Sequence, residues 1–481
     1  MKRWVLRSLL LWLASNFLLA GQTPPPATSD TVFLWLAGGL SHARVEQLIQ
    51  QRGLACHVTP SCAAVLQKSG IDDGLIQSLR RLPAGKPACE HSTPAVQVAA
   101  LVREKKFTEA EERIRAMLRQ DAKNPWLHFV LGTILRQEDR FDEALDVFTD
   151  TSRLMPGSPE VHSQLSYLFY RIDDADNAVA EARTALSMDP SNAEAYRYLG
   201  LALYANGQHD AALNAFQKSL EREHENADVY YDMGITLRDQ GDLRRAAIAY
   251  QHALKLRPQF WEAHSNLGVV LHDQGKLDEA LAEYREAKRL APDEASIRNN
   301  LGNTYCDKSE FDHAIAEFKD LYRQTPDWES GHSCLARAYM AKREYAAAIR
   351  ELRAAIRVNP SGAAEHRVLG QALLLSGRDE EAVSELRLAV SFNPKSAVAH
   401  HYLGTALVNT QQLAEAEKEF REALRLDASA QNHYSLAACL MALSRYEEAL
   451  GELEVASRMD PGQDLYRARM QEVVRLITAT R

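Results

Sequence analysis

The chain has 481 residues, of which 46% are apolar, so it is long enough to bury an extended core or several smaller ones. It carries 56 basic and 65 acidic residues, a net charge of −9. This balance lacks the basic excess that nucleic acid or an anionic membrane surface would require in a main partner, and it argues against both.

Residues 1–20 have the features of a secretory signal peptide. Lys2, Arg3 and Arg7 precede an apolar run that ends at Leu19, and Ala20 is followed by Gly21 at a position suited to cleavage. The run is also close to the minimum length of an uncleaved membrane anchor, so both interpretations stay open, with cleavage favoured. Cleavage would remove three basic residues and change the net charge from −9 to −12. We expect export to the periplasm or cell envelope, or secretion.

Two short segments follow the leader. Residues 21–30 are rich in proline and predict an extended linker. Residues 31–90 predict a small module of two or three short helices interrupted by glycine. The module is too small to hold an active site of its own, and we expect it to cap or anchor the segment that follows.

From residue 91 onward, alanine recurs with a period of about 34 residues, and one interval is shorter by a single residue. The recurring residues are Ala110, Ala144, Ala178, Ala212, Ala246, Ala280, Ala314, Ala348, Ala382, Ala416 and Ala449. A small residue at a fixed long spacing indicates a stack of similar helical units in which two helices cross closely.

Other residues keep fixed distances from this alanine. Around Ala144, Gly132 lies twelve residues earlier, Phe148 four later and Pro156 twelve later. The pattern resembles the tetratricopeptide repeat, and with the alanine as position 20 it divides residues 91–463 into eleven repeats. The repeats begin at 91, 125, 159, 193, 227, 261, 295, 329, 363, 397 and 430, and the repeat 397–429 is the shortened one.

This resemblance implies an all-α fold, a right-handed α-solenoid superhelix of about eleven helix-turn-helix repeats. Residues 464–481 place apolar side chains at helical spacing and predict a capping helix over the last repeat.

The resemblance also implies a ligand-binding groove lined by the first helix of each repeat. Tyrosine offers contact area with a polar tip, and asparagine can pair with both an amide donor and an acceptor, so both suit a peptide ligand. The residues expected to face the groove are Tyr167, Tyr170, Arg197, Tyr198, Tyr204, Tyr231, Arg238, Asn266, Asn299, Asn300 and Asn303.

Two sets of acidic residues recur in successive repeats. Glu160, Glu194, Asp228 and Glu262 stand at position 2, where the helix dipole favours a carboxylate, so a structural preference accounts for them. Asp239, Asp273 and Asp307 stand at position 13, near a helix C-terminus where the same field disfavours an acid. We therefore include these three among the candidate partner-binding residues.

Histidine recurs at position 4 as His128, His162, His264, His332, His366, His400 and His433. Neighbouring repeats place these rings about 10 Å apart, too far to share a metal ion, so we interpret them as packing residues. Cys56 and Cys62 could form a disulfide or remain free thiols, and their spacing argues against a zinc site. We expect Cys306, Cys334 and Cys439 to be buried and unbridged, because they stand at positions 12, 6 and 10 of their repeats.

We find no motif for a catalytic nucleophile, a metal-dependent hydrolase or a phosphate-binding loop. The sequence therefore predicts a non-catalytic, exported scaffold that binds a protein or peptide in its groove and assists the assembly of an envelope or secretion complex. We expect no cofactor, no metal, no nucleic acid and no membrane span after the leader. The alternative is an accessory subunit of polysaccharide modification or export, since exposed tyrosines also stack on sugars.

Overall fold

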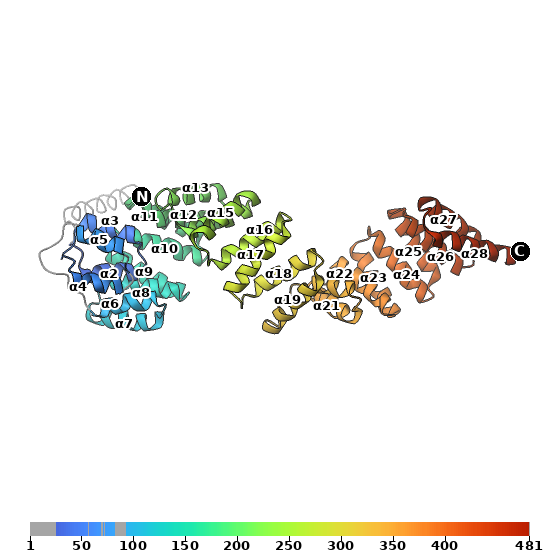
Figure 1. The fold of residues 1–481 in the computed structure, drawn as a ribbon, viewed down its shortest axis with the longest axis horizontal. Helices are drawn as coiled ribbons and strands as arrows, with labels where there is room; N and C mark the ends of the chain where they lie inside the picture. Colours follow the sequence, from blue (N-terminus) through green and yellow to red (C-terminus); the bar gives the residue numbers. More distant parts are fainter. Residues whose placement is uncertain (1–25, 56, 69–70, 72, 82–92, 481) are drawn as a thin grey trace, which may run out of the picture. The chain divides into compact units, whose positions relative to one another are not determined.

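The structure is a computed structural model that describes residues 26–55, 57–68, 71, 73–81 and 93–480. These residues form helices joined by short turns, with one isolated β-bridge between Ala27 and Leu54 (Figure 1). The chain divides into an N-terminal unit that ends at Asp242 and a C-terminal unit that begins at Leu243. The predicted signal peptide and residues 21–25 of the predicted linker lie outside the described residues.

The N-terminal unit contains α2 (Ser29–Ala37), α3 (His42–Arg52), α4 (Pro60–Lys68), α5 (Asp73–Arg81), α6 (Thr93–Arg103), α7 (Phe107–Gln120), α8 (Pro125–Gln137), α9 (Phe141–Leu154), α10 (Pro159–Arg171), α11 (Ala175–Met188), α12 (Ala193–Ala205), α13 (His209–Leu220) and α14 (Ala227–Asp239). The C-terminal unit contains α15 (Leu243–Leu256), α16 (Trp261–Asp273), α17 (Leu277–Leu290), α18 (Ala295–Asp307), α19 (Phe311–Gln324), α20 (His332–Ala341), α21 (Tyr345–Val358), α22 (Ala363–Leu375), α23 (Asp379–Phe392), α24 (Ala397–Asn409), α25 (Leu413–Leu426), α26 (Ala430–Ala442), α27 (Tyr446–Met459) and α28 (Asp464–Thr480).

The predicted all-α solenoid of helix-turn-helix repeats is confirmed. Every repeat begins its second helix at position 17, from Phe107 in the first repeat to Tyr446 in the last. The first helices begin at position 1 from α8 to α26, except that α20 begins at His332, position 4 of its repeat. The missing residue of the repeat 397–429 falls in the turn between α25 and α26, where it disturbs no helix.

The turn inside each repeat depends on one residue in the left-handed backbone region, at position 15. Gly207, Gly241, Gly275 and Gly377 fill it in four repeats with φ between 70° and 81°. Seven repeats place a residue with a side chain there, for example Asp139 at φ 57° and Ser444 at φ 61°. The turn geometry therefore overrides a conformational preference that disfavours positive φ for any residue with a Cβ atom.

The two helices of a repeat touch through position 8 and position 24. A Cβ atom added at Gly268 would lie 2.6 Å from the ring of Tyr284, and one at Gly404 would lie 2.8 Å from the ring of Phe420. The alanines at position 20, such as Ala280, are completely buried beside this crossing. Glycine at position 8 therefore leaves the space that the large side chain at position 24 occupies.

The helices α2 to α5 form a module ahead of the repeats, and α2 packs on the first helices α6 and α8. The Trp35 ring of α2 is completely buried and meets Trp126 of α8 edge-on, with ring centroids 5.5 Å apart. A Cβ atom on Gly38 would lie 2.7 Å from the ring of Phe129, so the C-terminus of α2 also lies directly on α8. The module shares one apolar core with the first repeats.

The expectation that Cys306 and Cys334 stay unbridged is wrong. They form a disulfide between α18 and α20, with Cα atoms 6.1 Å apart, in the range that a disulfide requires. Neighbouring first helices face each other with an offset, since Arg337 also contacts Asp307 of the preceding repeat. Because of this offset, position 12 of one repeat meets position 6 of the next, although the two positions differ within the repeat.

The other cysteines in the described residues, Cys62 and Cys439, have free thiols. Both are buried, and burial raises the pKa of each thiol, to about 11 for Cys439. Cys56, the candidate partner of Cys62, lies outside the described residues. At the end of the chain, α28 packs on α27, and its buried Tyr466 contacts the ring of Tyr434 in α26.

Replacing Gly268 with Ala should destabilise the C-terminal unit. Overpacking against Tyr284 costs about 1 to 3 kcal/mol, which exceeds the roughly 1 kcal/mol that alanine gains over glycine within a helix. Gly451→Ala is the matched control, because Gly451 lies inside α27 with nothing within 4 Å of an added Cβ atom. Thermal unfolding should show a loss for Gly268→Ala and none for Gly451→Ala. Equal effects of the two substitutions would contradict the crossing geometry.

Candidate functional site

Five of the predicted groove residues line one cavity in the N-terminal unit, of about 240 Å³. Tyr167 and Tyr170 come from α10, Arg197 and Tyr204 from α12, and Tyr231 from α14. These are first helices of three successive repeats, so each repeat contributes the same exposed helix face. We call this cavity the tyrosine pocket. Leu201, Asp232, Ile235, Thr236 and Arg171 complete its lining.

Basic side chains hold the first tyrosine of the pocket in place. The Arg171 guanidinium donates a hydrogen bond of 2.8 Å to the Tyr167 hydroxyl, and the Arg136 guanidinium lies 5.1 Å from the centre of the Tyr167 ring. The Tyr170 ring lies 6.3 Å from that of Tyr167. Burial raises the pKa of the Tyr170 phenol, with a further contribution from the Asp232 carboxylate, so the phenol keeps its proton and can donate it in a hydrogen bond.

A buried ion pair forms the floor of the tyrosine pocket. Nε of Arg197 donates to Oδ2 of Asp232 at 2.6 Å, and Asp232 is only 6% exposed. Burial raises the pKa of Asp232, and the Arg197 guanidinium opposes that effect. The pair leaves the floor with little net charge, and the tyrosine rings supply most of the surface that a ligand could contact.

Tyr198 does not line the pocket. It is 3% exposed, its hydroxyl donates to Oε1 of Glu194 at 2.8 Å, and its ring packs 5.1 Å from that of Tyr167. Burial, followed by the nearby Glu194 carboxylate, raises its pKa. Tyr198 therefore supports the pocket from beneath.

The three acids at position 13 are exposed, and each has a partner. Asp239 accepts a hydrogen bond from the Tyr204 hydroxyl and pairs with Arg238, and burial together with this bond raises the pKa of Tyr204 to about 12. In the C-terminal unit, the His272 imidazole lies 3.0 Å from Asp307 and 3.7 Å from Asp273. These partners reduce the charge that an acidic surface could offer to a ligand.

The predicted asparagines lie in the C-terminal unit on α16 and α18. Asn266, Asn299, Asn300 and Asn303 are all half-buried. Oδ1 of Asn299 accepts a hydrogen bond of 3.0 Å from the Ser330 hydroxyl, which leaves its amide N–H groups available. Asn300 stands at position 6 of its repeat. In the next repeat this position is occupied by Cys334, which forms the disulfide with Cys306.

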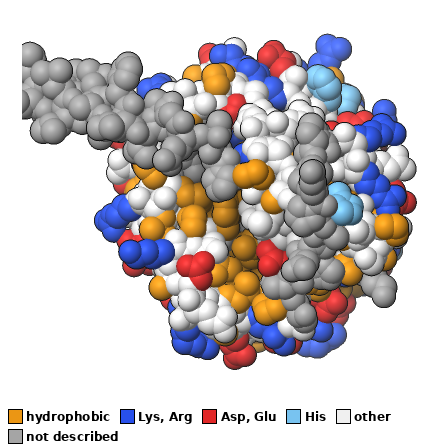
Figure 2. All heavy atoms as spheres, turned by 90° about the vertical axis from the view of Figure 1, so that its left-hand side faces the viewer, with side chains coloured by type: hydrophobic (Ala, Val, Ile, Leu, Met, Phe, Trp, Pro, Cys, Tyr) orange, Lys and Arg blue, Asp and Glu red, His pale blue; other side chains and the backbone are white. Residues whose placement is uncertain are grey.

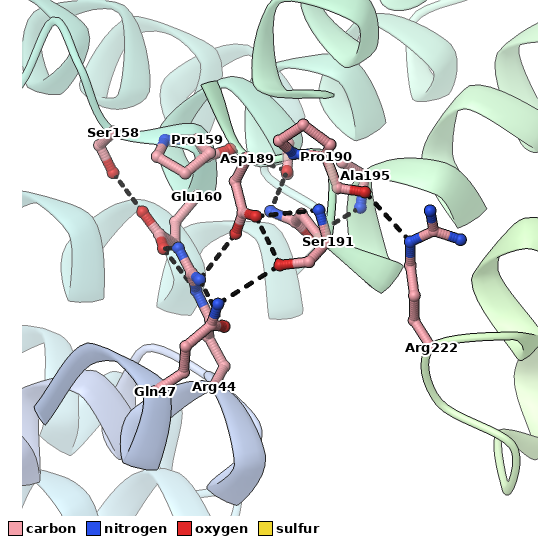
Figure 3. Close-up of polar contacts among 12 residues, drawn as sticks. Arg44, Gln47, Ser158, Pro159, Glu160, Asp189, Pro190, Ser191, Ala195 and Arg222 are labelled. Atoms are coloured by element: carbon pink, nitrogen blue, oxygen red, sulfur yellow. Dashed lines mark hydrogen bonds and ion pairs between the residues drawn. The ribbon is translucent and has the colours of Figure 1, made fainter. Parts of the chain in front are cut away.

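Sequence reasoning missed a second cavity, of about 510 Å³, between the module and the repeats. Arg44 of α3 donates a 2.8 Å hydrogen bond to Glu160 and pairs with Asp189 at 2.7 Å, and Gln47 donates to Ser191 at 3.3 Å (Figure 3). Glu160 therefore binds the module, in addition to any favourable effect of the helix dipole. Arg44 and Glu160 are 116 residues apart in the sequence, so no local sequence pattern predicts their contact.

Arg197 lines both this cavity and the tyrosine pocket, so the two adjoin. The module thus forms one wall of the cavity beside the tyrosine pocket. Figure 2 looks onto the end that carries the module and shows hydrophobic side chains gathered in a band among charged ones.

An apolar cavity of about 270 Å³, lined by Phe33, Leu36 and Val102 among others, also lies between the module and α6.

Among the described residues, no group of three or more His, Cys, Asp or Glu side chains is placed to hold a metal ion. Within the same residues, every helix is too short or too polar to cross a membrane.

Comparison with known sequences assigns the family. Residues 164–228, 231–295, 335–397 and 403–464 match a family model described as tetratricopeptide repeat, and residues 101–166 match a second model with the same description. The first model alone covers more than half of the chain, so the protein belongs to the tetratricopeptide repeat family. Repeats of this family form protein-binding scaffolds, and such scaffolds are generally non-catalytic. No curated protein matches the sequence.

Several solved structures are similar to parts of the chain. MamA is 25% identical over 33% of this chain and 94% of its own, with a TM-score of 0.29. YrrB, described as a TPR protein with an unusual peptide-binding site, is 26% identical over 41% of this chain and 97% of its own, with a TM-score of 0.33. A tetratricopeptide repeat protein from Parabacteroides merdae ATCC 43184 is 17% identical over 52% and 98%, with a TM-score of 0.37. The family assignment rests on the sequence models.

Replacing Arg197 with Met should destabilise the N-terminal unit by about 3 to 5 kcal/mol, because it leaves the buried Asp232 carboxylate without its partner. The double variant Arg197→Met with Asp232→Leu should recover most of the loss, since both charges are then removed. Denaturant unfolding measures both effects. A double variant that is as unstable as the single one would show that the pair does not act as a unit.

Proposed function

We propose that the protein is a non-catalytic scaffold, exported to the cell envelope, that binds a protein partner through the first helices of its repeats. The observation that carries this proposal is the tyrosine pocket, in which three successive repeats present aromatic side chains around one cavity. Tyrosine and arginine are enriched among the residues that dominate protein interfaces, and they act best in a well-packed pocket. The partner would anchor itself by inserting an apolar or aromatic side chain.

Export is supported by two features. The sequence of residues 1–20 has the basic start, apolar run and small residues of a signal peptide. The second feature is the Cys306–Cys334 disulfide, because disulfides persist in oxidising compartments and are rare in proteins of reducing ones. Assistance in the assembly of an envelope or secretion complex is the role that we infer from these features and the scaffold fold.

A second candidate function is an accessory role in polysaccharide modification or export. Sugar rings stack on aromatic side chains, and the tyrosine pocket offers several half-buried ones. We favour the protein partner, because the Arg197–Asp232 pair is already satisfied within the protein and leaves few polar groups for the many hydroxyls of a sugar.

A photo-crosslinking residue in place of Tyr231 should capture one defined protein in intact cells, in the envelope fraction. The same residue in place of Tyr196 is the control, because Tyr196 packs beneath the Arg222 guanidinium and does not line the pocket. With the captured protein purified, Tyr170→Ala and Tyr231→Ala should each weaken binding about tenfold or more, and Tyr196→Ala should not. Retention of the protein by glycan without any protein partner would contradict the proposal, and a cytoplasmic complex would contradict export.

A further inference from the structure

Six of the histidines at position 4 contact a glutamate at position 23, on the second helix of the same repeat. Each contact joins Nδ1 of the histidine to Oε2 of the glutamate at 2.6 to 2.8 Å. The pairs are His162–Glu181, His264–Glu283, His332–Glu351, His366–Glu385, His400–Glu419 and His433–Glu452. These histidines are therefore more than packing residues.

The repeats of this chain change the two positions together. Where tyrosine replaces the histidine, as Tyr196 and Tyr230, position 23 holds Ala215 and Ala249. His128 has Val147 at that position. It instead contacts the Ala122 carbonyl through Nε2, at 2.9 Å. The glutamate thus accompanies a basic side chain at position 4, which indicates that the contact depends on charge.

In three pairs of the C-terminal unit, the other ring nitrogen faces a second acceptor. Nε2 of His264, His366 and His400 lies 3.0 to 3.1 Å from the carbonyl oxygens of Pro258, Pro360 and Pro394. A carbonyl oxygen can only accept, so Nε2 must carry a proton. Nδ1 then faces a carboxylate oxygen, which requires another proton between these two atoms. Each pair therefore holds one proton more than a neutral imidazole beside an ionised glutamate would hold.

Arg298 makes the same two contacts at position 4 of its repeat. Its Nη2 donates to the Pro292 carbonyl at 2.8 Å, and its Nη1 lies 3.7 Å from Glu317, which stands at position 23. A guanidinium has donors on every nitrogen and keeps its charge at all pH values of interest. Since a permanent cation fits the site, the site itself favours the cationic form of histidine.

The surroundings of the three histidines also favour a cation. His264 faces Glu283 and Glu286 of α17, and its pKa is raised: burial lowers it, but the bonds to Glu283 and to the Pro258 carbonyl outweigh burial. His366 faces Glu385 of α23 and the ring of Phe392, and His400 faces Glu419 and Glu422 of α25. The next residue, His401, contacts the neutral Asn432, and burial lowers its pKa.

We propose that His264 is a proton-binding site that makes the C-terminal unit respond to pH, in a geometry that His366 and His400 repeat. The His264 cation joins the two helices of its repeat and ties both to the carbonyl of the turn that precedes the repeat. When the proton leaves to solvent at alkaline pH, one of the two hydrogen bonds at this site is lost. The junction between successive repeats then loosens, and the surface formed by the first helices changes with it.

The sign of the pH dependence follows from linkage. The pKa of His264 is raised in the folded protein, which therefore holds this proton at a pH at which the unfolded chain releases it, so raising the pH favours unfolding. For His264 the stabilisation is complete below about pH 6.5, the usual pKa of histidine, and is lost as the pH rises through the raised pKa of the folded state.

The first test uses the full chain with ¹⁵N-labelled histidine, because imidazole nitrogen shifts distinguish the cation from the two neutral tautomers. At about pH 7.5, above the usual pKa of histidine, His264 should still show a proton at both nitrogens, while His401 should be neutral. Single His→Gln variants assign the signals. A neutral signal from His264 at that pH would overturn the proposal.

The second test replaces His264 with arginine, the residue that the chain itself has at this position in Arg298. Thermal unfolding of this variant and of the wild type should coincide near pH 6, and the wild type should unfold several degrees lower near pH 8.5. His401→Gln is the matched control and should still lose stability as the pH rises toward 8.5. Parallel curves for the wild type and the arginine variant would contradict the proposal, and the nitrogen shifts remain decisive if the variant does not fold.

Discussion

The close crossing of two helices within each repeat is the constraint on which the structure depends. A small residue at position 8 and alanine at position 20 admit the large side chain of position 24, as Gly268, Ala280 and Tyr284 do. Because this contact recurs in most of the repeats, their first helices are presented in a similar way. Residues with no role in the crossing are then free to vary, and on the first helices they form the surface that we propose to bind the partner.

The tyrosine pocket follows directly from that arrangement. Three first helices bring Tyr167, Tyr204 and Tyr231 around one cavity, and the Arg197–Asp232 pair closes its floor. The module adds a wall through Arg44, which the carboxylates of Glu160 and Asp189 hold in place. Histidine–glutamate pairs join the two helices of a repeat in both units, as His162 with Glu181 and His264 with Glu283 do. The disulfide joins neighbouring first helices within the C-terminal unit.

The sequence predicted most of the fold, because the 34-residue period determines where the helices of each repeat lie along the chain. Five of the residues predicted to face the groove line one cavity, since the helix face repeats with the period. The sequence could not tell that Tyr198 is buried beneath that cavity. The sequence did not predict the Cys306–Cys334 bond. The two cysteines meet because neighbouring first helices pack with an offset, and this offset cannot be read from positions within one repeat. Arg44 was missed because its partner Glu160 is remote in sequence. The histidine–glutamate pairs did leave a signal, the glutamate at position 23, which a packing interpretation of position 4 overlooks.

Hydrogen exchange of the full chain, with and without its captured partner, can test whether the first helices form the binding surface. A partner bound at the tyrosine pocket should slow exchange in the first helices α10, α12 and α14 and leave the second helices α11 and α13 unchanged. Protection confined to the second helices, or to repeats remote from the pocket, would contradict that role.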